Sequence, residues 1–429
     1  MRTNSVRHAQ SQARVAVVGV GYTGLPLALG FARTGLSVIC LDNDPDKIAA
    51  ITSAQSYLPD VTDAELAAAS DRLHATTDPD KLSMSDSVVI CVPTPLDAHG
   101  APDLSAVFSV IDTVGPRMKP RCLIVLQSTV PPGTTRALAQ RLADRSGLLP
   151  GKDFHLAHAP ERIDPANKAG WNLANTPKLV GGLTPACTSA ATELFAQVIE
   201  HVVPVSTLEV AETAKVFENT FRMVNIALTY ELADLCASMS IPVNEVIDAA
   251  STKPYSFLAH RAGPGVGGEC IAVDPMFLTS VADKAGVDLP MICSAYRRIR
   301  ARPLTVAERL NELLRARGTD LAGSHVLVVG VAYKPGVADT RNAPAIDLIR
   351  ALRAADAKVS YTDPMVPELQ VDNEVVPYVD WSRESVSAAD CLVLTTPHEE
   401  IMRRPLWYAA PMLLDCWHIV QAGDGVVHL

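Results

Sequence analysis

One thiol lies at the end of an unusually glycine-rich segment, and this combination indicates covalent chemistry. Residues 263–270 read Gly-Pro-Gly-Val-Gly-Gly-Glu-Cys, and a carboxylate, Asp274, follows four residues later. Glycine lets a ligand approach the backbone closely, so Cys270 is a candidate nucleophile. The alternative is a buried, inert cysteine, which is the usual state of a free thiol. That alternative fits the cysteines in apolar runs better, namely Cys91, Cys122 and Cys391.

A lysine and an asparagine lie at helical spacing upstream of this segment. Residues 209–239 have the pattern of one long helix, and Lys215 and Asn219 are four residues apart in it, so both project from one face. A lysine beside an apolar stripe is usually a solvated or snorkelling side chain. Together with Cys270, however, Lys215 becomes a candidate proton carrier or charge stabiliser.

Two further groups follow predicted strands. Glu161 comes just after a strand predicted over residues 154–158, where it could act as a general base for water; the alternative is a surface turn. Lys334 and Arg341 follow a strand predicted over residues 325–330. Cations there can meet phosphate oxygens, although an ordinary solvated loop would read the same way.

A dinucleotide fingerprint opens the chain. Gly19, Gly21 and Gly24 follow the first predicted strand and start a helix, and Asp42 ends the second strand. This order places a diphosphate at the helix N-terminus and a carboxylate on the adenosine ribose, about 20 residues further on. Asp42 would repel a 2′-phosphate, which favours NAD over NADP, although Lys47 could soften the repulsion. The alternative is a turn that merely uses glycine.

The remaining cofactor contacts are predicted at the carboxyl ends of later strands, where ligands of parallel sheets bind. Their hydroxyl groups could equally serve turns and helix caps. The predicted cofactor-binding set is Gly19, Gly21, Tyr22, Thr23, Gly24, Asp42, Lys47, Thr94, Ser128, Thr129 and Arg341.

These groups need a scaffold that brings strand ends together. Short apolar runs alternate with helical patterns in both the first and the last part of the chain, which predicts doubly wound parallel sheets. The fold class is therefore α/β: two Rossmann-like domains joined by a central helical region with a long helix. The predicted boundaries are a disordered leader over residues 1–13, a cofactor-binding domain over 14–205, a helical region over 206–318 and a nucleotide-binding domain over 319–429.

The amino-acid composition of the chain limits the classes of partner that it is expected to bind. The chain has 429 residues, is 48% hydrophobic and 20% charged, and carries a net charge of −10, which argues against a nucleic-acid or anionic-membrane surface. Nine scattered cysteines without a metal-ligand spacing predict a reducing cytoplasm and no metal site. No apolar run approaches the roughly 18 residues of a membrane span.

With these motifs in view, the chain resembles the UDP-glucose/GDP-mannose dehydrogenases, a family of nucleotide-sugar 6-dehydrogenases. The resemblance extends from about Arg14 to His418. Its most specific blocks are VAVVGVGYTGLPLA, STVPPGTT, APERIDP, AETAKVFENTFRMVNIAL, GPGVGGECIAVDP and GVAYKPGVADTRNAP. The family oxidises a sugar C6 alcohol to a carboxylate with two NAD, and it implies a dimer formed through the central helices.

The resemblance also implies residue roles. Cys270 would trap the aldehyde and carry a thioester, and Glu161 would be the base for its hydrolysis. The implied catalytic set is Cys270, Lys215, Asn219, Asp274, Glu161 and Thr129. The implied substrate-binding set is Glu161, Arg162, Lys215, Asn219, Gly267 and Lys334.

The substrate follows from family branch. Residues 251–257, 266–268 and 273–275 are more like the enzymes for UDP-N-acetylhexosamines, and Val273 stands where the UDP-glucose branch has a lysine. UDP-N-acetylglucosamine is the favoured substrate, with UDP-N-acetylmannosamine, UDP-glucose and a dTDP-sugar as alternatives. Two departures are Thr23, in place of a small apolar residue, and Glu269, in place of His or Ser. A carboxylate beside Cys270 would raise the pKa of its thiol.

Two rival functions remain open on the sequence. A 3-hydroxyacid dehydrogenase also joins a Rossmann unit to a helix with Lys and Asn, but it needs neither Cys270 nor a second α/β domain. A non-catalytic NAD-binding sensor would bind cofactor without turnover.

Overall fold

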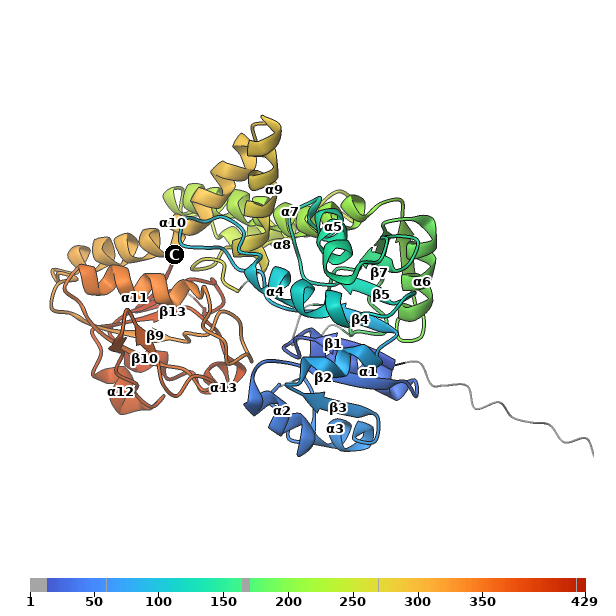
Figure 1. The fold of residues 1–429 in the computed structure, drawn as a ribbon. Coiled ribbons are helices and arrows are strands. Elements are labelled where there is room, and N and C mark those ends of the chain that lie inside the picture. The colour runs from blue at the N-terminus through green and yellow to red at the C-terminus, as the bar shows by residue number, and fades with distance from the viewer. Residues whose placement is uncertain (1–13, 59, 164–169, 269, 422) are drawn as a thin grey trace, which may run out of the picture. The chain divides into compact units, whose positions relative to one another are not determined.

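The computed structural model describes residues 14–58, 60–163, 170–268, 270–421 and 423–429. The predicted leader, Glu269 and the Asp164–Pro165 end of one motif lie outside them. The chain divides into two compact units (Figure 1), of which the first runs up to Phe217 and includes Met276–Val281, and the second holds Glu218–Pro275 and Ala282–Leu429. The boundary falls within two helices, α7 (Leu208–Ser238) and α9 (Cys270–Ala285).

The first unit is built on an eight-stranded sheet in the order β3-β2-β1-β4-β5-β6-β7-β8. All its pairings are parallel except β6 with β7, which is antiparallel. The strands are β1 (Arg14–Val18), β2 (Ser37–Leu41), β3 (Leu73–Thr76), β4 (Ser87–Ile90), β5 (Leu123–Leu126), β6 (His155–His158), β7 (Lys178–Gly182) and β8 (Val202–Val205).

Both faces of this sheet are covered, because successive strand residues point to opposite sides. Val15 and Val17 belong to one core cluster and Ala16 and Val18 to another. The first cluster is completed by α1 (Gly24–Arg33), α2 (Pro45–Thr52), α3 (Asp63–Ala69) and α6 (Pro185–Phe195). The second is completed by α4 (Ser105–Val114) and α5 (Thr134–Ser146). This is the predicted doubly wound arrangement.

Several strands were not predicted from the sequence. β3 reads Leu-His-Ala-Thr, β7 ends in two glycines, and β8 contains Pro204. β3 and β7 are not clear apolar runs. β8 is apolar but contains a proline, which is characteristic of a sheet edge, and β8 lies at the edge. The β6–β7 pair is an antiparallel exception within the predicted parallel sheet.

The helical part of the second unit packs around α7. Met223 and Tyr230 of α7 share a core with Ile247 of α8 (Val243–Ser251) and Ile299 of α10 (Pro290–Ala316). The C-terminal half of α10 then covers a second sheet, through Val306 and residues after it. The long helix predicted over residues 209–239 is thus confirmed within one residue at each end.

The second sheet has five parallel strands in the order β10-β9-β13-β14-β15. They are β9 (His325–Val329), β10 (Lys358–Thr362), β13 (Cys391–Leu394), β14 (Leu413–Asp415) and β15 (Val426–His428), the last of which was not predicted. Helices α10 and α11 (Pro344–Ala354) cover one face, and α12 (Arg383–Ser387) and Trp407 the other. The unit also holds the short pair β11 (Gln370–Val371) and β12 (Glu374–Val375) and helix α13 (Glu399–Met402).

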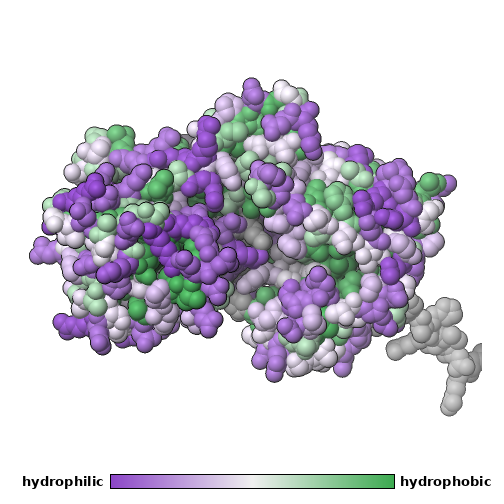
Figure 2. Space-filling view, turned by 60° about the vertical axis from the view of Figure 1, so that its left-hand side comes forward, coloured by the Kyte–Doolittle hydropathy of each residue, from purple (hydrophilic) through white to green (hydrophobic). Residues whose placement is uncertain are grey.

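The surface of the protein is mixed in hydropathy. On the face drawn in Figure 2, hydrophilic residues predominate and hydrophobic ones form smaller patches among them. Among the described residues, no helix is both long and apolar enough to cross a membrane.

Candidate functional site: a dinucleotide turn, a cysteine loop and a buried carboxylate cluster

The glycines of the fingerprint have different neighbours. Gly19 has φ +87°, and a Cβ there would lie 2.9 Å from the carbonyl oxygen of Cys91. A Cβ on Gly24 would lie 1.9 Å from the carbonyl oxygen of Gly19, whereas one on Gly21 would meet nothing within 4 Å. Gly19 and Gly24 are therefore required by the protein itself, while Gly21 leaves open space where a ligand could approach.

The start of α1 is suited to an anion. Its N-cap residue, Thr23, makes no side-chain capping bond, and its first turn has no acidic residue. First-turn N–H groups have no intrahelical partner and carry the positive end of the helix dipole. These residues fit the diphosphate of a dinucleotide; Tyr22, beside them, is half-buried.

Asp42 is held at the end of β2, next to this turn. Its Oδ2 accepts a hydrogen bond from the Val20 N–H at 2.9 Å, and its Oδ1 accepts one from the Asp44 N–H at 3.0 Å. The ammonium group of Lys47 lies 3.6 Å from Oδ2. The carboxylate is thus fixed beside the glycine turn, and its contact with a ribose hydroxyl remains a prediction.

The predicted hydroxyl groups hold two loops together. The Thr94 hydroxyl, after β4, donates to the carbonyl of Thr129 at 2.6 Å, and the Ser128 hydroxyl, after β5, donates to the carbonyl of Val92 at 2.6 Å. Both protons are therefore used by backbone, and only the lone pairs of these hydroxyls are left for a ligand. Thr129 is half-buried at the same strand end.

Glu161 belongs to a buried cluster that the sequence did not indicate. Its Oε2 lies 2.9 Å from Lys178 Nζ and accepts from the amide of Gln127 at 3.2 Å. Its Oε1 accepts the N–H groups of Arg162 and Ile163 at 2.8 and 3.0 Å. Glu161 is therefore no surface turn residue. The guanidinium group of Arg162 reaches the carbonyl of Pro177 at 2.8 Å.

A second buried carboxylate, Glu212 of α7, was also missed. Its two oxygens accept the N–H groups of Gly133 and Thr135 at 2.6 and 2.7 Å. It thereby caps α5, and it lies one turn before Lys215, which is itself buried. Burial raises the pKa of Glu212 despite these bonds. This cap ties the start of α7 to the loop that carries Thr129.

In the second unit, Asn219 and Asp274 come together. The Asn219 amide donates to Asp274 Oδ2 at 2.5 Å, and the Asp274 side chain is buried. Asp274 lies one turn after Cys270, which is the first residue of α9. The predicted association of Asn219 with the cysteine segment thus has a direct contact at Asp274.

The glycine-rich segment packs against the loop after β9. A Cβ on Gly267 would lie 2.7 Å from Tyr333 Cβ, and one on Gly268, which has φ +80°, would lie 3.0 Å from the Tyr333 ring. The Gly268 N–H donates to the carbonyl of Arg341 at 3.2 Å. The glycines are therefore needed for close approach between these two segments.

That loop also carries the predicted phosphate-binding cations. Lys334 is half-buried, while Arg341 is exposed and makes an ion pair with Asp339 at 2.6 Å. The turn directly after β9 resembles the turn at Gly19. Gly330 has φ +82°, and Asp363, at the end of β10, accepts the Val331 N–H at 2.6 Å. Here the carboxylate is bonded to His398 at 3.0 Å, so it is less available to a ribose than Asp42.

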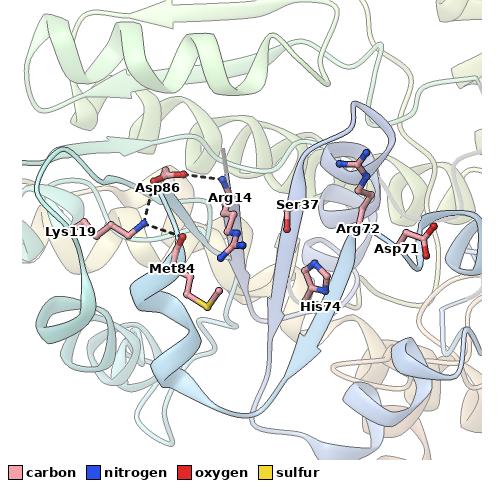
Figure 3. Close-up of a pocket in the computed structure, with 8 residues that line it drawn as sticks. All are labelled: Arg14, Ser37, Asp71, Arg72, His74, Met84, Asp86 and Lys119. Atoms are coloured by element: carbon pink, nitrogen blue, oxygen red, sulfur yellow. Dashed lines mark hydrogen bonds and ion pairs between the residues drawn. The ribbon is translucent and has the colours of Figure 1, made fainter. Parts of the chain in front are cut away.

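A cavity of about 870 Å³ opens elsewhere on the first unit (Figure 3). Arg14, Ser37 and His74 lie at the amino-terminal ends of β1, β2 and β3, and Asp86 and Lys119 line it too. Ligands of parallel sheets bind at the carboxyl ends. All the predicted cofactor residues of this unit follow strand ends of that kind, so the cavity is not their site.

Fold and site together define a dinucleotide-dependent dehydrogenase, and comparison with known proteins specifies it further. Three models of the UDP-glucose/GDP-mannose dehydrogenase family match in succession: the NAD binding domain at residues 13–199, the central domain at 209–299 and the UDP binding domain at 327–422. The chain belongs to this family and is an NAD-dependent nucleotide-sugar dehydrogenase. The predictions of family and cofactor are confirmed.

Individual relatives match over nearly their full length. UDP-N-acetyl-D-mannosamine dehydrogenase of Pyrococcus horikoshii is 34% identical over 90% of both chains. UDP-N-acetyl-D-glucosamine 6-dehydrogenase of Salmonella typhi is 32% identical over 91% of both. Among solved structures, the UDP-D-ManNAc dehydrogenase of Pyrococcus horikoshii superimposes with a TM-score of 0.88 at 32% identity, covering 97% of this chain and 98% of that one.

Proposed function

We propose that the protein oxidises the C6 alcohol of a UDP-N-acetylhexosamine to the uronic acid, with UDP-N-acetylglucosamine as the preferred substrate. The sugar class is supported by the relatives, whose names include both the gluco and the manno epimers. The chemistry rests above all on one observation. A loop of closely packed glycines leads to Cys270 at the first turn of α9, one turn before the Asn219–Asp274 pair.

Cys270 would carry the substrate between two oxidations. Bound NAD supplies the hydride acceptor, and two molecules used in succession remove the four electrons that separate an alcohol from an acid. The Cys270 sulfur adds to the aldehyde carbon, and the carbonyl oxygen takes up a proton to give a thiohemiacetal. After the second oxidation the carbon is a thioester. Water then adds to the thioester carbon, and the C–S bond breaks. The Cys270 thiolate is released, and the product is the free carboxylate.

The surrounding residues take complementary parts in this proposal. Cys270 would act as the nucleophile from the first residue of α9. Lys215 and Asn219 would stabilise negative charge on the substrate oxygen, with Asp274 orienting Asn219. Glu161 would accept the proton of the hydrolytic water. For water to reach it, one of its four donors must yield, and the Gln127 amide makes the longest of those contacts.

Lys334 and Arg341 would bind the substrate diphosphate and the cofactor, respectively. Arg162, Gly267 and Thr129 complete the proposed site. The domain boundaries predicted from the sequence are part of the same proposal. Because Gly268 bonds to the Arg341 backbone, the nucleotide-binding loop and the cysteine loop would be ordered together.

We also infer a homodimer. Phe221, Leu228 and Leu235 repeat every seven residues along α7 and are exposed, Leu228 by 63%. Such a stripe is typical of a helix that meets a partner. Leu228→Glu should halve the mass measured by light scattering; an unchanged mass would exclude this helix from the interface.

The function is tested with the purified protein, NAD and a panel of UDP-N-acetylglucosamine, UDP-N-acetylmannosamine, UDP-glucose and dTDP-glucose. About two NADH per sugar consumed is expected for the double oxidation, and the fastest sugar identifies the substrate. About one NADH per hydroxyacid, with every sugar inactive, would support a single-oxidation enzyme instead. Cofactor binding without turnover would support a sensor.

A further inference from the structure

Lys178 opens β7 and is buried in the first unit. Its side chain is only 3% exposed, and its Nζ lies 2.9 Å from Glu161 Oε2 and 3.1 Å from the Gln127 carbonyl oxygen. The ring of Phe195 lies 5.3 Å from the same atom. A buried ammonium group is retained only where an anion compensates it. Glu161 is the one carboxylate that pairs with Lys178 among the residues the structure describes.

The carboxylate of Glu161 is fully engaged. Each of its oxygens accepts two donors, Lys178 and Gln127 at one, and the N–H groups of Arg162 and Ile163 at the other. A carboxylate has about four lone-pair directions, so all of them are used. Burial alone would raise the pKa of Glu161, but the Lys178 charge and these hydrogen bonds outweigh it, and the pKa is lowered.

Two other titratable groups at this cluster are uncharged, and the guanidinium of a third is bonded to backbone. His158, at the end of β6, is neutral, because burial and then the Lys178 charge lower its pKa to about 3. Cys91, after β4, is protonated, because burial raises the pKa of its thiol to about 12. The Arg162 guanidinium is bonded to the carbonyl of Pro177. Among the described residues, Lys178 is the cation whose ion pair with the Glu161 carboxylate the structure shows.

We propose that Lys178 is a positioning residue for thioester hydrolysis: it keeps Glu161 ionised and, together with Gln127, orients the Glu161 carboxylate. Gln127 holds both partners, since its amide donates to Glu161 and its oxygen accepts from Lys178. When the amide turns away, one lone pair of a charged carboxylate becomes free for water. This inference rests on the proposed function, because it assigns Lys178 through the base role of Glu161.

The test compares Lys178→Met, Lys178→Gln and Lys178→Arg with Glu161→Gln, using NAD and the substrate found in the panel. Lys119→Met is the matched control, since it removes a lysine that pairs with Asp86 at 3.3 Å at the opposite end of the strands. Steady-state kcat is measured against pH, and the rapid NADH release is counted in the first turnover.

The neutral Lys178 variants should move the acidic limb of the kcat profile upward by about 1–3 pH units, which is the effect of a close opposite charge on a carboxylate. Their first-turnover release should stay at about two NADH per site, because both oxidations precede hydrolysis. Lys178→Arg should return the limb toward the wild-type position, and Lys119→Met should not move it. Lys178→Gln keeps a polar group and provides the measurement if Lys178→Met does not fold.

Equal loss of kcat at every pH by the folded neutral variants, with no shift of the limb, would overturn the proposal and leave Lys178 a purely structural residue. So would a failure of Lys178→Arg to restore the limb. If Glu161→Gln turns over like the wild type, the base role itself is wrong, and the Lys178 assignment falls with it. A slow Glu161→Gln combined with unshifted Lys178 variants refutes the Lys178 assignment alone.

Discussion

Two glycines of the cofactor turn, Gly21 and Gly24, offer a test that separates the stability of the fold from the binding of the cofactor. Alanine at Gly24 places a methyl group 1.9 Å from a backbone oxygen, that of Gly19, whereas alanine at Gly21 meets no protein atom within 4 Å. We expect Gly24→Ala to weaken both folding and NAD binding. Gly21→Ala should weaken NAD binding alone, because its methyl group enters only the space left for the diphosphate.

The magnitudes follow from the contacts. The obstacle at position 24 is backbone, so the overpacking cost lies near the upper end of its usual range, about 3 kcal/mol. Gly24 is the first residue of α1, so the helix-interior propensity of alanine offsets little of this cost. A loss of about 3 kcal/mol would lower the melting temperature by about 6–12 °C for a unit of this size. Gly21→Ala should be neutral, or more stable by about 0.4–1 kcal/mol through the unfolded chain.

The assay pairs thermal unfolding with calorimetric titration of NAD. For Gly21→Ala we expect a melting temperature that is unchanged or slightly raised, and a Kd raised about tenfold or more, which corresponds to at least about 1.4 kcal/mol. Wild-type affinity in Gly21→Ala would refute a diphosphate seated on that backbone. A wild-type melting temperature in Gly24→Ala would refute the close approach of α1 to the turn.

Three further outcomes are expected. Gly268 has φ +80°, and a Cβ there would lie 3.0 Å from the Tyr333 ring, so Gly268→Ala should cost about 1–2 kcal/mol of stability and lower kcat. Equal kcat in the variant and the wild type would show that the cysteine loop tolerates the strain. Glu212→Ala leaves the Gly133 and Thr135 N–H groups unpaired and should cost about 2–4 kcal/mol, more than Glu212→Gln; urea unfolding of the two variants decides. Burial, followed by the Lys178 charge, lowers the pKa of His158 from 6.5 to about 3. The free energy of unfolding should therefore be unaffected by His158 above about pH 6.5. It should fall as the pH is lowered from there toward about 3, by up to about 1.4 kcal/mol per pH unit. His158→Gln should flatten that slope in urea titrations, and an unchanged slope would mean that His158 titrates alike in both states.

Local patterns in the sequence determined much of the fold. The strand–glycine–helix order around Gly19 predicted the first unit, the long amphipathic segment predicted α7, and the apolar runs predicted most strands of both sheets. These features depend on near neighbours in the chain, since periodicity and turn residues act over a few positions. The strands that were missed lack such patterns: β7 begins with a lysine and ends in glycines, and β8 contains proline.

The candidate site was determined only in part by the sequence. Residue types singled out Cys270, Glu161, Lys215, Asn219 and Asp274, but not how they are held. Which strands become neighbours decides that Lys178 of β7 meets Glu161 after β6. The folding of α7 beside α9 lets Asn219 bond to Asp274, 55 residues away. A lysine at a strand start looks like a solvated side chain until the sheet buries it, because the cost of burying a charge, and the partner that offsets it, exist only in the tertiary structure.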